Sequence, residues 1–214
     1  GSKVQDNVIY AVEGWGVWLG STENGPSNAA DANAIWRSHA GIYAVGASTI
    51  QNNLVFNIEA WGLISQDPGL GTFEDIDISY NTVANTADWG MYLEDWETIS
   101  GNVLVNNAVC NPVGRSVYMA DPDPDDEIEP YQNHLISSNL LCGWMVGLYD
   151  YAGHYIAGDG LSDFSSIEAW DFYPAVDSLL IDAADISAGM EPPTYDFNGM
   201  ERDAGSPEIG AYDW

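Results

Sequence analysis

The chain has 214 residues, and its 33 acidic residues against 4 Lys and Arg give it a formal net charge of −29. A field of this sign repels nucleic acid and anionic membranes, so we exclude both as partners. Hydrophobic residues make up 46% of the chain, which excludes a disordered acidic tail and suffices for one sizeable core. No apolar run of about 18 residues occurs, so no membrane span is predicted.

Six similar segments follow one another along the chain. Each has an Asn beside a first short apolar stretch, and in three of them a second apolar stretch begins ten residues after that Asn. The repeats cover residues 4–21, 33–44, 50–67, 78–95, 99–121 and 136–150.

The spacing of these repeats predicts the fold. Their second apolar stretches begin at residues 17, 42, 63, 91, 117 and 146, so neighbouring repeats lie 21 to 29 residues apart. This is the period of a solenoid, in which a single coil cannot bury its own apolar face. The stretches are short, β-branched and separated by Asn, Gly and Asp, without helical periodicity. We therefore predict an all-β, right-handed parallel β-helix of about six rungs, with the hand taken from the crossover rule.

Stacking of the rungs converts each repeat position into a column along the axis. An Asn column should form a ladder at one corner, because Asn tolerates a left-handed turn and stacked amides hydrogen-bond to one another. The first core column is Val4, Ile50, Ile78, Ile99 and Ile136. The second is Ile9, Ile35, Val55, Val83, Leu104 and Leu141, and the third is Val17, Ile42, Leu63, Met91, Val117 and Val146. The expected ladder is Asn7, Asn33, Asn53, Asn81, Asn102 and Asn139.

The repeat pattern fades after Tyr151, so residues 3–163 are predicted as rungs and 164–214 as a partial rung with a capping tail. The tail contains the motifs DS…IDA at 177–183, DFNG…R at 196–202 and EIGAY at 208–212. They resemble the C-terminal signature of secreted bacterial right-handed β-helix repeat proteins, of the pectate-lyase-like superfamily in the broad sense. Ala184, Asn198, Glu208 and Asp213 depart from that signature. The resemblance implies the scaffold and a secreted location, but it carries no catalytic motif.

The outward position of the second stretch is aromatic in four of six repeats. These residues are Trp18, Tyr43, Tyr92 and Tyr118, with Ile64 and Gly147 at the other two positions. An aromatic stripe on a long sheet can bind sugar rings, or it can serve only to pack side chains of neighbouring rungs. A second column, Trp15, Trp61, Trp89 and Trp144, is expected to stack at a bend, with Arg115 over one ring as a cation–π contact.

Acidic residues recur just past the second stretch. Asp67, Asp95, Asp121 and Asp150 share one position, Glu94 adds a carboxylate, and Asp123 lies in the acidic insertion 121–130. Carboxylates on neighbouring rungs would lie about 5 Å apart. These six residues are predicted to bind Ca²⁺, and Asp95, Asp121 and Asp150 are alternatively candidates for a catalytic pair. A turn that simply favours Asp is the third interpretation.

Three functions remain open on the sequence. The first is a secreted or cell-surface module that binds polysaccharide or glycan on the aromatic stripe, with Ca²⁺ on the acidic column. The second is a glycoside hydrolase, and the third is a structural spacer of a larger surface protein. A polysaccharide lyase of the resembled superfamily is disfavoured, because it would need a Lys or Arg base and the chain has few. Cys110 and Cys142 fall on adjacent rungs, so a disulfide between them is geometrically possible.

Two expectations concern the surroundings of the protein. The near absence of Lys indicates a saline setting, where salt screens the self-repulsion of the acidic surface. Val4 begins a rung with an open strand edge, so we expect further N-terminal rungs or a partner chain to cap it.

Overall fold

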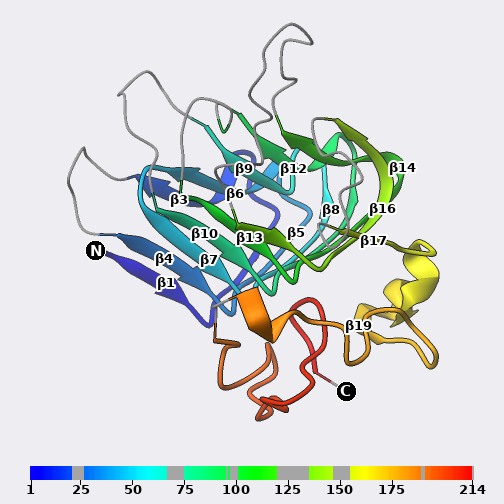
Figure 1. Cartoon of the computed structure of the whole chain (residues 1–214). Coiled ribbons are helices and arrows are strands. Elements are labelled where there is room, and N and C mark those ends of the chain that lie inside the picture. Colours follow the sequence, from blue (N-terminus) through cyan, green and yellow to red (C-terminus); the bar gives the residue numbers. More distant parts are fainter. Residues whose placement is uncertain are drawn as a thin grey trace, which may run out of the picture.

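The computed structural model describes residues 1–20, 27–66, 75–94, 96, 101–119, 135–146, 155–188 and 191–213. In these ranges the chain winds into a parallel β-helix, which confirms the predicted fold class (Figure 1). All strand pairs of the solenoid are parallel. Within the same ranges, none of the helices has the length and hydropathy needed to cross a membrane.

Each rung contributes up to three strands, which stack into three columns. The first column is β1 (Lys3–Gln5), β4 (Asn28–Asp31), β7 (Ser48–Gln51), β10 (Ile76–Ser79), β13 (Val103–Val105) and β15 (Leu135–Ser137). The second is β2 (Val8–Tyr10), β5 (Ala34–Trp36), β8 (Leu54–Ile58) and β11 (Thr82–Thr86). The third is β3 (Trp15–Gly20), β6 (Ala40–Val45), β9 (Leu63–Ser65) and β12 (Trp89–Leu93). β14 (Ala108–Met119) and β16 (Asn139–Val146) run through both the second and third columns, and β17 (Tyr155–Ala157) extends the second.

The interior of the solenoid is filled by apolar side chains from all three columns. Ile35, Ile42, Ile50, Leu63 and Met91 are fully buried there. They alternate with outward residues because successive side chains of a strand point to opposite faces. The predicted core columns are therefore correct through the first four rungs.

The fifth rung differs from the prediction. Leu104, not Ile99, pairs with Ile78 in the first column, and Val109, not Leu104, pairs with Val83 in the second. The pattern of an apolar residue followed three positions later by Asn occurs twice here, at 99–102 and at 104–107. Only the second copy places β13 and β14 beside their partner strands, so the predicted alignment was five residues too early.

A ladder of asparagines, buried from Asn33 onward, follows one corner of the solenoid. Side-chain amides donate in sequence from Asn7 to Asn33, to Asn53 and to Asn81 over 2.9 to 3.0 Å. The ladder then continues through Asn107 to Asn139. Asn102 was the wrong member, because its Oδ1 accepts the Ile76 N–H elsewhere on the rung. The steps of the ladder are 26, 20, 28, 26 and 32 residues long.

The C-terminal segment packs on the outside of the second strand column (Figure 1). Its elements are η3 (Leu161–Asp163), β18 (Phe164–Ser166), η4 (Ile167–Ala169), β19 (Asp171–Pro174) and η5 (Ile186–Ala188). Phe172, Leu180 and Ile209 of this segment are buried against Leu54 and Phe56 of β8. The protein thus has a second apolar cluster outside the solenoid, and this cluster fixes the segment to the rungs.

A disulfide joins the fifth and sixth rungs. Cys110 of β14 and Cys142 of β16 face each other in register, with Cα atoms 4.6 Å apart. Both cysteines point outward into the apolar cluster beneath the C-terminal segment. The bond that the sequence left open is therefore formed in the structure.

Candidate functional site

The four aromatic residues predicted to bind glycan lie in one column on the outside of the third strand column. Trp18 pairs in register with Tyr43, and Tyr92 with Tyr118, while Ile64 lies between the two pairs. The Trp18 side chain is 68% exposed, and the three tyrosines are partly buried. The structure therefore brings the predicted residues together, with Trp18 as the most accessible ring.

The sixth position of this column was predicted one residue too late. Tyr118 faces Val146, not Gly147, because the pairing of β14 with β16 is irregular between Arg115 and Val117.

The predicted tryptophan column packs against the aromatic column at the first three rungs. The Trp15 ring stacks on Tyr43, with centroids 4.7 Å apart, and on Trp61, with centroids 6.3 Å apart. Trp18 tilts against Tyr43 at 6.2 Å. We call Trp15, Trp18, Tyr43 and Trp61 the aromatic face. Its inner three rings are held by one another, so the outer indole of Trp18 sits on a rigid base.

On the fourth and fifth rungs the rings mainly cover each other. Tyr92 and Tyr118 stack at 4.6 Å with an interplanar angle of 8°, and Trp89 lies 5.2 Å from Tyr118. The Arg115 guanidinium lies 5.0 Å from the Trp89 ring centroid, which confirms the predicted cation–π contact. Rings that cover each other stabilise the rungs but leave less surface for a ligand.

A second aromatic row, which sequence reasoning missed, follows the second strand column. Tyr10 stacks on Trp36 at 5.3 Å, and Trp36 stacks on Phe56 at 5.6 Å. Trp170 of the C-terminal segment lies against this row, 5.4 Å from Trp36. Its signal was the aromatic residue directly after each core residue Ile9, Ile35 and Val55.

The predicted acidic column lies almost wholly outside the described residues. Asp67, Asp95, Asp121, Asp123 and Asp150 belong to the parts of the chain that the structure does not describe. Glu94 is described: it is partly buried directly after β12, and its N–H donates to the Ser65 carbonyl oxygen over 2.9 Å. Two statements therefore remain predictions: that these carboxylates lie close together, and that two of them form a catalytic pair.

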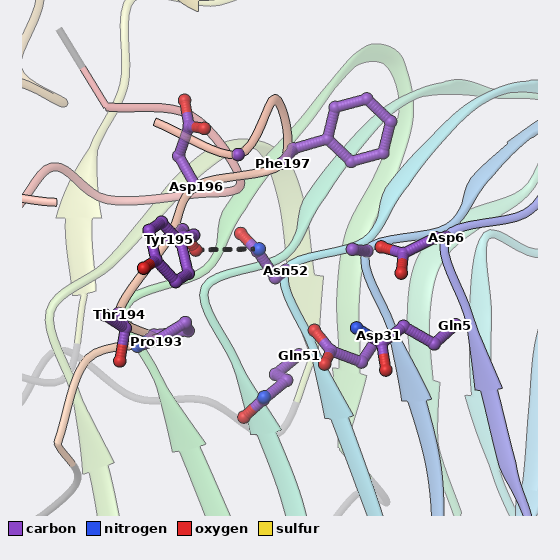
Figure 2. Close-up of a pocket in the computed structure, with 12 residues that line it drawn as sticks. Gln5, Asp6, Asp31, Gln51, Asn52, Pro193, Thr194, Tyr195, Asp196 and Phe197 are labelled. Atoms are coloured by element: carbon purple, nitrogen blue, oxygen red, sulfur yellow. Dashed lines mark hydrogen bonds between the residues drawn. The ribbon is translucent and has the colours of Figure 1, made fainter. Parts of the chain in front are cut away.

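A polar cleft of about 460 Å³ opens between the first three rungs and the C-terminal segment. Figure 2 shows Gln5, Asp6 and Asp31 on the rung side and Tyr195 on the opposite side. The cleft brings together residues as far apart in the sequence as Gln5 and Gly199, and no sequence motif indicated it.

A buried cluster surrounds the disulfide. The sulfurs of Cys110 and Cys142 and a carboxylate oxygen of Asp163 all lie within 4.8 Å of one another. Asp163 accepts the Asp159 N–H over 2.8 Å, and burial raises the pKa of its carboxyl above the ordinary value. Within the described ranges, this is the one group of three or more His, Cys, Asp or Glu side chains close enough to share a metal.

A comparison with known protein families gives a match to this chain. The family model described as "Periplasmic copper-binding protein (NosD)" matches residues 1–141, which is most of the solenoid. The chain belongs to the NosD family. No curated protein and no solved structure matches it.

Membership of the NosD family corrects two expectations. The resemblance to secreted β-helix repeat proteins was right for the parallel β-helix, and the matched family is described as periplasmic, but nothing supports the pectate-lyase-like part. The predicted Ca²⁺ cofactor is wrong, since the family is described as copper-binding. The physical difference lies in the donors: Ca²⁺ prefers hard oxygen atoms, such as those of an acidic column, whereas copper prefers nitrogen and sulfur.

The described residues of this NosD protein do not fit a copper ion. The sulfurs of Cys110 and Cys142 are bonded to each other, so neither is available as a thiolate. Met91 and Met119 are fully buried in the core, and His39 lies on the surface 3.8 Å from Glu59. In the described ranges, the His and Cys side chains therefore do not assemble a donor set for copper.

Proposed function

We propose that this member of the NosD family is an extracytoplasmic β-helix module that binds a polysaccharide or cell-surface glycan on its aromatic face. The observation that carries the proposal is the Trp18 indole, which is 68% exposed beside packed rings. An aromatic ring kept in water on a rigid surface offers a flat apolar face to the C–H groups of a sugar ring.

The charge of the protein favours a neutral glycan. The net charge of −29 repels uronate- or sulfate-rich chains, and the chain has only four Lys and Arg to offset it. Rigid stacking of Trp15, Tyr43 and Trp61 lowers the conformational entropy lost on binding. The proposed ligand is therefore a neutral polysaccharide bound along the first three rungs.

The Trp18→Ala variant tests this proposal. Loss of one exposed stacking ring should weaken retention in affinity electrophoresis through a neutral polysaccharide gel by about tenfold, equal to about 1.4 kcal/mol. The fold should be unaffected, because the side chain is mostly exposed. Tyr10→Ala is the matched control, since Tyr10 is 60% exposed and belongs to β2 of the second strand column, outside both the aromatic face and the polar cleft. Equal retention of the wild type and Trp18→Ala, or no retention of the wild type on any neutral gel, contradicts the proposal.

A further inference from the structure

One corner of the solenoid holds the C-terminal segment at some rungs and not at others. On five successive rungs this corner residue has a left-handed backbone, with φ between 52° and 59°. The residues are Asp6, Ala32, Asn52, Tyr80 and Asn106. We call them the corner column, and their stacking follows from hydrogen bonds between neighbouring rungs.

At the third to fifth rungs the corner column binds the C-terminal segment. The Asn52 amide donates to the Tyr195 carbonyl oxygen over 3.1 Å, and its oxygen accepts from Arg202 over 3.1 Å. The Arg202 guanidinium lies 5.1 Å from the Tyr80 ring centroid. Asn106 accepts the Asp185 N–H over 2.8 Å. The segment is therefore fastened to these three rungs.

At the first two rungs the corner column leaves the segment unattached. Neither Asp6 nor Ala32 hydrogen-bonds the segment within the described ranges. Ala32 ends at a methyl group where Asn52 has an amide, so nothing fills the space above it. The polar cleft of about 460 Å³ opens at this place, with Ala32 in its wall. Its volume is in the range of small-molecule sites.

The chemistry of the cleft selects one class of ligand. The side chains of Gln5, Asp6 and Gln51 line it and make no hydrogen bond within the described part of the chain. Asp31 is paired with Lys3 at 2.9 Å, so its charge is offset. Unpaired amides and a carboxylate suit adjacent hydroxyl groups, and the exposed Tyr195 ring suits an apolar C–H surface. The acidic surroundings exclude an anionic ligand.

We propose that this cleft binds a neutral sugar unit, as a site separate from the aromatic face. Hydroxyls of the sugar donate to Asp6 and exchange hydrogen bonds with the amides of Gln5 and Gln51. The site does not depend on Trp18, so it stands or falls independently of the function proposed above.

Two substitutions at Ala32 test the cleft without disturbing the fold. Ala32→Asn restores the residue type that fills the corner at Asn52, and Asn tolerates the left-handed backbone. Ala32→Gly is the control, because Gly adopts the left-handed backbone without steric cost and leaves the cleft open. Saturation-transfer NMR and calorimetry with maltose, cellobiose and lactose should show binding to the wild type and to Ala32→Gly. Ala32→Asn should lower the affinity at least about tenfold.

Three results overturn the proposal. The first is the absence of saturation transfer from the wild-type protein to any of the three disaccharides. The second is disaccharide binding that survives in Ala32→Asn but is lost in Trp18→Ala, which assigns the sugar to the aromatic face alone. The third is binding of putrescine in place of the disaccharides, which makes the cleft a cation site. Loss in Ala32→Asn with retention in Trp18→Ala supports the cleft.

Discussion

A single buried asparagine ties together three rungs of this solenoid. The Asn81 amide donates to the Ile50 carbonyl oxygen over 2.8 Å and to Asn107 Oδ1 over 3.0 Å. Its own Oδ1 accepts the backbone N–H and the side-chain amide of Asn53. All of these groups are buried and cannot bond to water. The asparagine side chains instead provide hydrogen-bond partners for the backbone groups at the corner that do not pair with a neighbouring strand.

Asn81→Ala should therefore be strongly destabilising. It leaves the Asn53 backbone N–H and the Ile50 carbonyl without these partners, and buried unsatisfied groups cost about 1–3 kcal/mol each. We expect the free energy of unfolding to fall by about 3 kcal/mol in urea denaturation. Asn7→Ala is the control, because Asn7 is exposed at the first step of the ladder and should cost less than about 1 kcal/mol. If both variants lose the same free energy of unfolding, the buried positions of the ladder contribute no more stability than its exposed end.

Single residues also show how far the sequence determines the fold. The corner asparagines were predictable through Asn81, because each follows an apolar residue by three positions. The left-handed backbone expected of them lies one residue earlier, as at Tyr80 before Asn81. At the fifth rung both Asn102 and Asn107 satisfy that local rule. The choice between them depends on how β13 and β14 pair with the preceding rung, which is a tertiary contact that a single-repeat pattern does not contain.

At the scale of elements, glycines control how closely the rungs approach. A Cβ added at Gly62 would lie 2.6 Å from the Gly90 carbonyl oxygen, and one added at Gly90 would lie 2.8 Å from that of Ser116. The Trp-Gly pairs of the sequence therefore mark a backbone contact between rungs. The sequence indicated a bend there, but the contact itself exists only once the rungs are stacked.

The disulfide is the covalent link between two elements, and its loss should lower stability. Cys110 and Cys142 close a loop with a sequence separation of 32 residues, which constrains the unfolded chain. In the chain-entropy model, a disulfide that closes a loop of this kind stabilises the folded protein by about 3 kcal/mol, because it restricts the unfolded chain. We expect reduction, and the double substitution Cys110→Ala with Cys142→Ala, to lower the free energy of unfolding by similar amounts. An unchanged urea midpoint, with thiol titration proving full reduction, would contradict this role.

Of the two candidate sites, one was predictable from the sequence and the other was not. The column that contains Trp18 and Tyr43 was predictable, because it follows from strand alternation within one repeat. The cleft was not, because its walls come from the corner near Asp6 and from the segment near Tyr195. That contact depends on how the C-terminal segment docks, which is governed by Asn52, Asn106 and the outer apolar cluster and not by a periodic pattern.

At the scale of the whole molecule, charge is the dominant property. A net charge of −29 makes the folded chain repel itself, and salt relieves the repulsion by shortening the Debye length from about 10 Å at 0.1 M to about 3 Å at 1 M. We therefore expect the free energy of unfolding to rise with NaCl across this range, in keeping with the proposed saline setting. KCl should act equally, and sucrose of equal osmolarity should not reproduce the full effect. A urea midpoint that stays constant or falls with salt would contradict the expectation.

The unequal steps of the asparagine ladder have a consequence for how this protein can change. The strand positions that follow each ladder residue are nearly constant, whereas the connection from the third strand column to the next rung varies from residues 46–47 to residues 120–134. Lengthening a loop costs little entropy once its ends are fixed. Insertions and deletions in this connection can therefore change the surface of the protein without changing the register of the core strands. It is the natural position at which to graft a foreign peptide.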